Sequence, residues 1–244
     1  MHAAWSDASC GDLRPTGRPG QRAARLEGWA RLATGRAVGQ SPVREVHWLD
    51  QVHGSTVVVT AAGTASPPLP GKPRRGVGSL WAGSGDALVS TGPVVAVAVL
   101  TADCAAIALG SREGVFAAVH AGWRGLVGGV VEAAVGAMRG LGATDVVGAL
   151  GPCIHPGCYE FSEDDLATVA GLYGGRVRGR TRAGRPALDV PAAVSAALAA
   201  GGAAEAPGIN ACTACAGGYF SHRARSERGR QALIVWSAGG SVPE

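Results

Sequence analysis

Aromatic and charged side chains are scarce in this chain of 244 residues, where they make up 5% and 16% of the sequence. The net charge of +4 is spread over 22 basic and 18 acidic residues. This charge is too mild and too dispersed for a surface that binds nucleic acid or a membrane. We therefore expect a small-molecule substrate and no nucleic-acid or membrane partner, and the sequence carries no signal of an oligomeric state.

Export and membrane-spanning signals are also lacking. The first fifteen residues contain two acids and no apolar run of the kind found in signal peptides. The longest apolar stretch, residues 93–110, is interrupted by Thr101, Asp103 and Cys104, which a lipid-spanning helix rarely carries at its centre. We expect two buried strands around this polar junction. We also expect a cytoplasmic protein whose six cysteines are reduced thiols or metal ligands.

Short β-branched runs are interspersed with helical patterns, which indicates an α/β (α+β) mixed sandwich. Strands are predicted at 43–54, 55–61, 86–90, 93–100, 105–109, 115–120, 146–150 and 231–236. Helices are predicted at 22–33, 126–140, 162–174 and 189–202, the last two with Ser162 and Asp189 as N-caps.

The chain is expected to form one domain over residues 21–244, preceded by an irregular segment at 1–20 that is rich in Gly, Pro and Arg. The Pro/Gly-rich stretch 61–78 is predicted to be a surface loop within that domain. A linker between two domains fits less well, because the candidate chemical residues lie on both sides of this stretch.

Three apolar runs each end in a metal-binding side chain: His53 in DQVHG, Cys104 in LTADC and His120 in AVHAG. Strand ends of this kind are where open α/β sheets gather their active sites. Two histidines and one cysteine would form a three-ligand zinc site with a fourth position open, as in catalytic zinc centres. The same residues could instead fill the core, or Cys104 could be a nucleophile with His120 as its base.

Five motifs occur in order along the chain: QVHG, TADC, HAGWRG, GPCI followed by CYEF, and CT…FS.R…GRQA. Over about Trp48 to Trp236, this order resembles the YfiH-type laccase-domain family, also called multicopper polyphenol oxidase-like, purine nucleoside phosphorylase-like or peptidoglycan editing factor-like. In that family the first three motifs bind one zinc, which here implies His53, Cys104 and His120 as ligands. The resemblance also implies a single-domain mixed α/β fold related to cysteine-hydrolase toxins.

Two segments depart from the family pattern. Members usually begin with an aromatic-Thr-x-Arg-x-Gly-Gly-Val-Ser segment, and this chain has SDASCGDLRP in its place. The usual FSYRR is FSHRA here, which keeps Arg223 but places His222 where a tyrosine is expected. These departures point to altered substrate specificity with retained metal chemistry.

The resemblance implies purine nucleoside chemistry: phosphorolysis of inosine, guanosine or adenosine, cleavage of methylthioadenosine, and deamination of adenosine. Arg124 is expected to clamp phosphate beside a helix that begins near Leu126, while Trp123 packs the turn or a base. Gln51 and Arg223 are further candidates for substrate binding. Asp103 is either a general base, a residue that orients a metal ligand, or a strand-end carboxylate bonded to local amides.

Other functions remain open. Some relatives are amidases that remove a wrongly incorporated L-serine from a cytoplasmic UDP-sugar precursor of peptidoglycan, and a zinc-binding module without turnover is a further alternative. A laccase is less favoured, because several coppers would need more ligands than six histidines and two methionines supply. Copper instead of zinc in the single site is still conceivable.

A few residues have both a functional and a purely structural interpretation. Asp86 is either a pocket residue or a turn-closing aspartate, and Arg230 is either a phosphate contact or a solvated charge. Tyr159 and Glu160 are predicted to be pocket or structural residues. The remaining pattern consists of Cys153, Cys158, Cys212 and Cys215, which could form a second, structural zinc site or be simple buried thiols.

Overall fold

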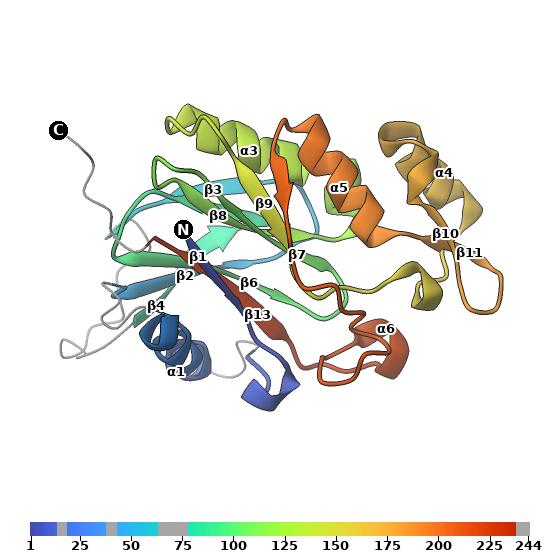
Figure 1. The fold of residues 1–244 in the computed structure, drawn as a ribbon. Helices are drawn as coiled ribbons and strands as arrows, with labels where there is room; N and C mark the ends of the chain where they lie inside the picture. Colours follow the sequence, from blue (N-terminus) through green and yellow to red (C-terminus); the bar gives the residue numbers. More distant parts are fainter. Residues whose placement is uncertain (14–18, 38–42, 63–77, 238–244) are drawn as a thin grey trace.

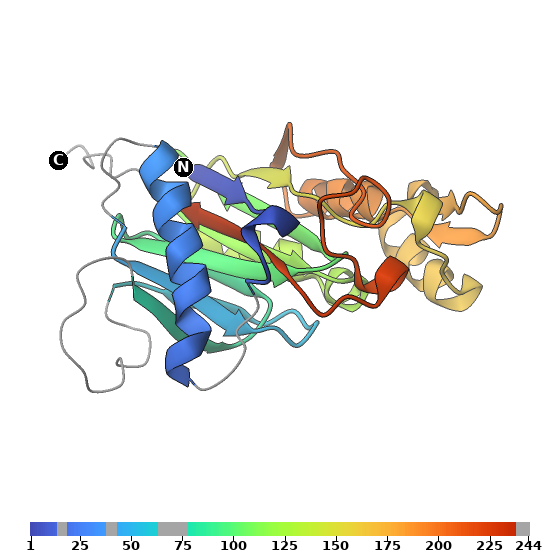
Figure 2. The same cartoon turned by 90° about the horizontal axis from the view of Figure 1, so that it is seen from below.

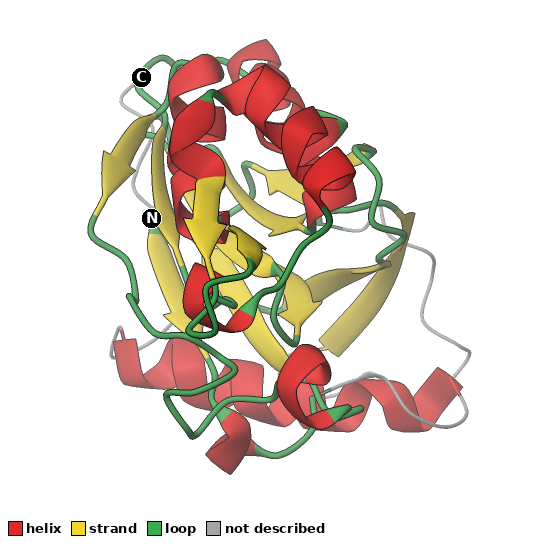
Figure 3. Ribbon diagram, turned by 90° about the vertical axis from the view of Figure 1, so that its right-hand side faces the viewer, coloured by secondary structure: helices red, strands yellow, loops and turns green. Residues whose placement is uncertain are grey.

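Two β-sheets pack face to face at the centre of the structure, and helices cover both outer faces (Figures 1 and 3). The computed structural model describes residues 1–13, 19–37, 43–62 and 78–237. Its four layers are a long helix, a five-stranded sheet, a six-stranded sheet and a second layer of helices. This arrangement is the predicted mixed α/β single domain.

The five-stranded sheet has the order β1-β13-β6-β2-β4. Its strands are β1 (His2–Trp5), β13 (Gln231–Trp236), β6 (Val95–Thr101), β2 (Glu45–Asp50) and β4 (Gly78–Ser84). Strand β2 runs parallel to both of its neighbours, while the pairs β1–β13 and β13–β6 are antiparallel.

The six-stranded sheet has the order β12-β9-β7-β8-β5-β3. Its strands are β12 (Ala204–Ala206), β9 (Val147–Leu150), β7 (Ala105–Gly110), β8 (Phe116–Ala121), β5 (Ala87–Ser90) and β3 (Val57–Thr60). The two outermost pairs are parallel and the inner pairs are antiparallel. A separate hairpin joins β10 (Arg178–Arg180) to β11 (Pro186–Leu188).

Helix α1 (Pro19–Ala37) lies across the outer face of the five-stranded sheet, as Figure 2 shows from below. The other sheet is covered by α2 (Trp123–Val127), α3 (Val130–Gly140), α4 (Glu163–Tyr173) and α5 (Val190–Ala200). A short helix, α6 (His222–Arg225), lies near the lower end of both sheets in Figure 1. Of the helices in the described part of the chain, none is long and apolar enough to cross a bilayer.

Alternation along the strands decides which residues enter which layer. In β6, Val95, Val97 and Val99 face the other sheet, while the intervening Ala96 and Ala98 pack toward α1. In β8, Phe116 and Ala118 face the space between the sheets, and Ala117 and Val119 pack against the helices. His120 continues the first of these two sets, so its side chain belongs to the space between the sheets at the end of β8.

Two expectations about the elements need correction, and a third lies mostly outside the described residues. Residues 2–5 are strand β1, although the segment 1–20 was expected to be irregular, because pairing with β13 supplies the order that composition does not reveal. The predicted helix 126–140 is divided between two helices, since the chain breaks at Gly128 and at Gly129, which has a left-handed φ of 76° and is the N-cap of α3. The predicted loop 61–78 lies outside the described residues from 63 to 77, and Gly78 opens β4.

Candidate active site

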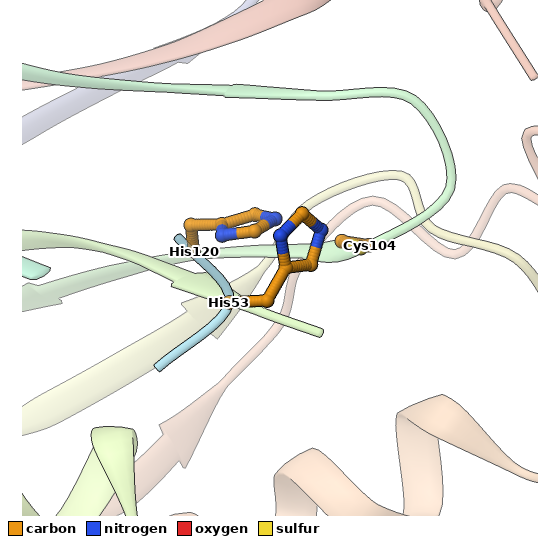
Figure 4. Close-up of side chains that lie close together, drawn as sticks. All are labelled: His53, Cys104 and His120. Atoms are coloured by element: carbon orange, nitrogen blue, oxygen red, sulfur yellow. The ribbon is translucent and has the colours of Figure 1, made fainter. Parts of the chain in front are cut away.

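His53, Cys104 and His120 meet at the ends of strands from both sheets (Figure 4). His53 follows β2, His120 is the penultimate residue of β8, and Cys104 lies on the connection that passes from β6 in one sheet to β7 in the other. One ligand atom from each side chain lies within 4.8 Å of the other two. The structure therefore brings together all three residues that the strand ends had indicated.

Asp86 holds two of these three residues in position. Its carboxylate, which is fully buried, accepts a hydrogen bond from His120 Nδ1 at 2.8 Å and another from the backbone N–H of His53 at 2.9 Å. The N–H groups of Val52 and Gly54 also donate to it, at 3.3 and 2.7 Å. Because a carboxylate only accepts, Nδ1 of His120 carries a proton, and Nε2 is the ring nitrogen left to face a ligand.

Backbone conformation at the site is unusual. His53 and Asp103 have φ values of 60° and 98°, a region that non-glycine residues seldom occupy and that is concentrated at functional sites. Gly122 is needed for a different reason: a Cβ there would lie 3.0 Å from the His53 ring and 3.3 Å from Cys104 Sγ. The glycine of HAGWRG thus allows the other two ligands to approach β8.

The thiol and the imidazoles shift each other's pKa values. Burial disfavours the Cys104 thiolate, but hydrogen bonds and positive charge from His120 and His53 outweigh it and lower the pKa of Cys104 to about 6. Burial likewise disfavours a charged His120, yet Asp86 and Cys104 raise the pKa of His120 to about 9. The site therefore stabilises a thiolate at neutral pH, the form that both metal binding and nucleophilic attack require.

These three side chains fit a zinc ion. The donor set of two imidazole nitrogens and one thiolate is one that zinc accepts, and the carboxylate behind His120 is the usual support for a metal-bound histidine. His53 is exposed while His120 is buried, so the group is open on one side. Copper accepts the same donors.

A cavity of about 610 Å³ opens beside this group. Both sheets and the 222–230 segment contribute to it. The lining consists of Trp48, Leu49, Asp50, Gln51, His53, Leu100, Thr101, Ala102, Asp103, Cys104, His120, Ala121, Gly122, Trp123, Ile154, Tyr159, Val190, His222, Arg223 and Arg230. It combines three aromatic side chains with two arginines, which is a suitable surface for a flat, polar and anionic substrate.

Arg124 and Gln51, the predicted phosphate and substrate ligands, each contact a neighbouring residue. Arg124 is exposed and absent from the cavity lining, and its guanidinium stacks on the Trp123 ring at 4.2 Å. Gln51 does line the cavity, but its amide donates to the carbonyl of Leu100 and accepts from the same residue's N–H, both at 2.7 Å. Gln51 thus fastens the end of β2 to β6.

Asp103 links distant segments around the cavity. One carboxylate oxygen accepts from the Thr213 hydroxyl at 2.6 Å, and the other accepts from the Arg223 N–H at 2.7 Å. These partners are far away in sequence, whereas local amides were one of the alternatives considered for this carboxylate. Each oxygen thus accepts a hydrogen bond from a segment more than one hundred residues away, which ties these segments to the turn that carries Cys104.

Residues from the late motifs complete the cavity. Arg223 stacks on the Tyr159 ring at 4.8 Å, and Arg230 lies at the wall with its guanidinium bonded to the carbonyl of Gly229 at 2.9 Å. His222 also lines the cavity, whereas Glu160 is exposed and paired with Arg185. Sequence reasoning missed Trp48 and Asp50, whose only signal was their place at the end of a strand that leads to His53.

The other histidines do not join the candidate metal centre. His47 is bonded to Glu45 and Thr60, and His2 stacks on Trp236. Met138 is buried among the helices that cover the six-stranded sheet. Two groups of side chains within the described residues are close enough to hold a metal, one with His53, Cys104 and His120 and one with three cysteines. Together they contain two histidines, which is too few for a multicopper centre.

Known proteins similar to this chain are named for nucleoside chemistry. It is 39% identical to "Purine nucleoside phosphorylase SCO2081" of Streptomyces coelicolor, over 82% of this chain and 78% of that protein. It is 38% identical to "Purine nucleoside phosphorylase ORF3" of Streptomyces griseus, over 95% of this chain and 89% of that one.

Solved structures share the fold. A Neisseria meningitidis protein, NMB0706, superimposes with a TM-score of 0.73 at 24% identity and covers 98% of this chain and 91% of its own. The Bacillus licheniformis protein YfiH gives a TM-score of 0.72 at 18% identity, over 92% and 86%. The model of the multi-copper polyphenol oxidoreductase laccase family matches residues 26–238. The chain therefore belongs to this laccase-like family, to which the YfiH-type fold corresponds.

Proposed function

We propose that this protein is a purine nucleoside phosphorylase that holds zinc at His53, Cys104 and His120. The observation that carries the proposal is the cavity, in which this group of ligands lies between aromatic side chains and two arginines. The names of the Streptomyces relatives support the same substrate class. Cleavage of methylthioadenosine and deamination of adenosine are included in the proposed range of activities.

The aromatic side chains of the wall are suited to a purine base. Trp123 is held by an edge contact with Phe161 at 5.4 Å and by Arg124 on its face, and Tyr159 is held by Phe161 and Arg223. Burial raises the pKa of Tyr159, so its hydroxyl remains protonated at neutral pH and can donate to a ring nitrogen.

Arg223 and Arg230 take the place of Arg124 as phosphate ligands. In phosphorolysis a phosphate oxygen bonds to C1′ of the ribose while the bond from C1′ to the purine nitrogen breaks. The electron pair leaves with the purine, which takes up a proton, and ribose 1-phosphate forms. Arginines at the wall hold phosphate by charge-assisted hydrogen bonds, and the cavity supplies the orientation of the two reactants.

His53, Cys104 and His120 would hold the zinc, with copper as the alternative metal. Bound there, the metal would supply Lewis acidity to a substrate or water at the cavity. The protein's own part is to fix Nδ1 of His120 as the nitrogen bonded to Asp86, so that Nε2 is the atom turned toward the metal, and to keep Cys104 as a thiolate.

The test is incubation of the zinc-analysed protein with inosine, with and without phosphate, followed by mass spectrometry of the products. We expect hypoxanthine and ribose 1-phosphate only when phosphate is present, and at least a hundredfold less product from Cys104→Ala. Cys10→Ala is the matched control, because Cys10 is exposed and outside the cavity lining. Full activity in a metal-free Cys104→Ala protein would refute the proposal.

One observation favours a second function. Cys104 would be the nucleophile, His120 the base beside it, and Asp86 the carboxylate that orients the base. Such a chain of hydrogen-bonded groups supports acyl transfer. A cytoplasmic amidase that removes L-serine from a UDP-sugar precursor would use it. Release of serine from that precursor by a zinc-loaded protein that leaves inosine intact would favour the amidase over the phosphorylase.

A further inference from the structure

A second group of cysteines lies outside the candidate active site. Cys158, Cys212 and Cys215 place their sulfur atoms within 4.8 Å of one another. Cys158 ends a 3-10 turn, Pro156–Cys158, while the other two belong to the CTAC segment more than fifty residues later. Cys212 and Cys215 are close in sequence, but Cys158 can meet them only because the fold brings two separate loops together.

The spacing of the sulfur atoms is suited to a metal. Zinc binds thiolates at about 2.3 Å, so two sulfurs in its tetrahedral shell are separated by about 3.8 Å. A disulfide would join two of the sulfurs at about 2 Å and leave the third without a function. All three cysteines are free thiols in the structure. The third sulfur is the feature that favours a shared ion over a disulfide.

The backbone around Cys212 is arranged for a ligand. The N–H of His155 donates to Cys212 Sγ at 3.4 Å, and the N–H groups of Cys215 and Ala216 bond to the Cys212 carbonyl at 3.3 and 2.9 Å. This tight turn directs the two sulfurs of CTAC to the same side. Cys153, the fourth cysteine of the predicted four-cysteine site, forms a backbone bridge with Cys212, but its sulfur does not belong to the group.

We propose that Cys158, Cys212 and Cys215 bind one thiophilic divalent metal ion, zinc, separate from the ion at His53, Cys104 and His120. The fourth position faces solvent, because Cys215 is exposed and Cys158 is partly exposed. Binding displaces the thiol protons to solvent and forms three metal–sulfur bonds, with no change in oxidation state.

The second ion would influence the cavity through the two loops that carry its ligands. Ile154 and Tyr159 flank the first loop and line the cavity, while Thr213 in the second loop bonds to Asp103. Arg225 of α6 donates to the carbonyl of Ala214, also in the second loop. A metal that joins the two loops would therefore hold the segment that carries His222 and Arg223 against the opposite wall.

The experiment counts metal in a protein whose first site has been removed. In a His53→Ala/Cys104→Ala variant, purified with reductant and without chelator, we expect one zinc per chain by elemental mass spectrometry. The unsubstituted protein should hold two. Adding Cys215→Ser should abolish the remaining equivalent, and adding Cys10→Ser, an exposed cysteine outside the group, should preserve it.

Cobalt gives a second readout that does not depend on activity. Cobalt added to the double variant should produce the near-ultraviolet thiolate charge-transfer band and the visible bands of a tetrahedral site, and both should disappear with Cys158→Ser or Cys215→Ser. A double variant that binds neither metal overturns the proposal, as does a Cys212–Cys215 disulfide found in the purified protein. Since no substrate is used, these outcomes are independent of whether the protein cleaves nucleosides.

Discussion

Asp86 divides its hydrogen-bonding capacity between a side chain and a turn. One oxygen accepts from His120 Nδ1 and the His53 N–H, and the other accepts from the N–H groups of Val52 and Gly54. Because the carboxyl is fully buried, no solvent replaces these bonds when one is lost. The same residue thus fixes Nδ1 as the protonated nitrogen of one candidate ligand, His120, and the backbone position of another, His53.

Asp86→Asn should weaken both functions. The NH2 group of the asparagine cannot accept a hydrogen bond, so the donors that face it lose their partner. This loss should lower the free energy of unfolding by about 1–3 kcal/mol. Zinc affinity at His53, Cys104 and His120 should fall about 10–100-fold, the usual effect of losing such a support. Denaturant unfolding and a competitive zinc titration measure the two effects. Asp145→Asn, at an exposed position, is the control, and equal behaviour of the two variants would contradict the assigned role.

Local sequence was sufficient to select the three candidate ligands that the structure brings together, but not the side chains around them. Each ligand ends an apolar run, and a run of that kind predicts where a strand stops. The direction of a flexible side chain has no comparable signal, so the pattern that predicted Arg124 as a phosphate ligand does not show that it stacks on Trp123. Gln51 was expected to bind substrate because the pattern does not show that the neighbouring strand offers it the Leu100 backbone.

Helices α2 and α3 illustrate how one residue divides an element. Apolar spacing runs through residues 126–138 as for one helix, but Gly129 adopts a left-handed φ of 76°. Gly136 lies within α3, is exposed and has nothing within 4 Å of the place where a Cβ would stand. Gly129 therefore interrupts the helical conformation, whereas Gly136 adopts it.

Alanine at these two positions should shift stability in opposite directions. Gly129→Ala places a Cβ in the left-handed region and should lower the free energy of unfolding by about 1–2 kcal/mol. Gly136→Ala should raise it by up to about 1 kcal/mol, since alanine loses less entropy in a helix. Paired urea titrations measure both, and a gain from Gly129→Ala would show that the break is not required.

Thr213 connects the CTAC loop to the turn between β6 and β7. Its hydroxyl, fully buried, donates to Asp103. Thr213→Val keeps the shape but leaves the carboxylate short of a donor, so the free energy of unfolding should fall by about 1–3 kcal/mol. In Thr168→Val, where the exposed hydroxyl bonds to the Asp164 carbonyl, the change should stay within about 0.5 kcal/mol. A negligible effect at Thr213 would mean that Asp103 is satisfied without it.

Elements with their own periodicity and caps could be predicted, and elements made by long-range pairing could not. Ser162 and Asp189 accept from the N–H groups of Asp165 and Ala192, as their N-cap assignment requires. By contrast, β1, β10, β11 and β12 are three or four residues long and depend on a partner strand. No local pattern distinguishes such short strands from loops.

At the scale of the whole molecule, the candidate zinc site joins segments of both sheets. Removal of the metal should therefore lower the free energy of unfolding of the whole protein. Zinc present at a thousand times its dissociation constant contributes about 4 kcal/mol, and a chelator should remove that amount in a denaturant titration. His53→Ala should lower the stability and reduce the chelator effect by about that amount, so that the remaining effect belongs to the ion proposed at Cys158, Cys212 and Cys215. Equal chelator effects in both proteins would place the stabilising ion elsewhere.

The fold class followed from interspersed strands and helices, but the strand order did not. The connection through Ala102 to Cys104 moves the chain from one sheet to the other within a few residues, so two consecutive strands are not neighbours. Hydrophobic alternation in β6 and β8 is the same whichever sheet a strand joins. The four layers become visible only when the pairing of distant strands is known.

Strand β13, near the end of the chain, pairs with β1 on one side and β6 on the other. During synthesis, β1 and β6 both emerge from the ribosome well before residues 231–236 exist. Until then the five-stranded sheet lacks an inner strand, and two backbone edges that end up covered are exposed to other chains. Folding of this sheet must therefore wait until residues 231–236 have been made, and a nascent chain without them exposes both edges to pairing with other chains.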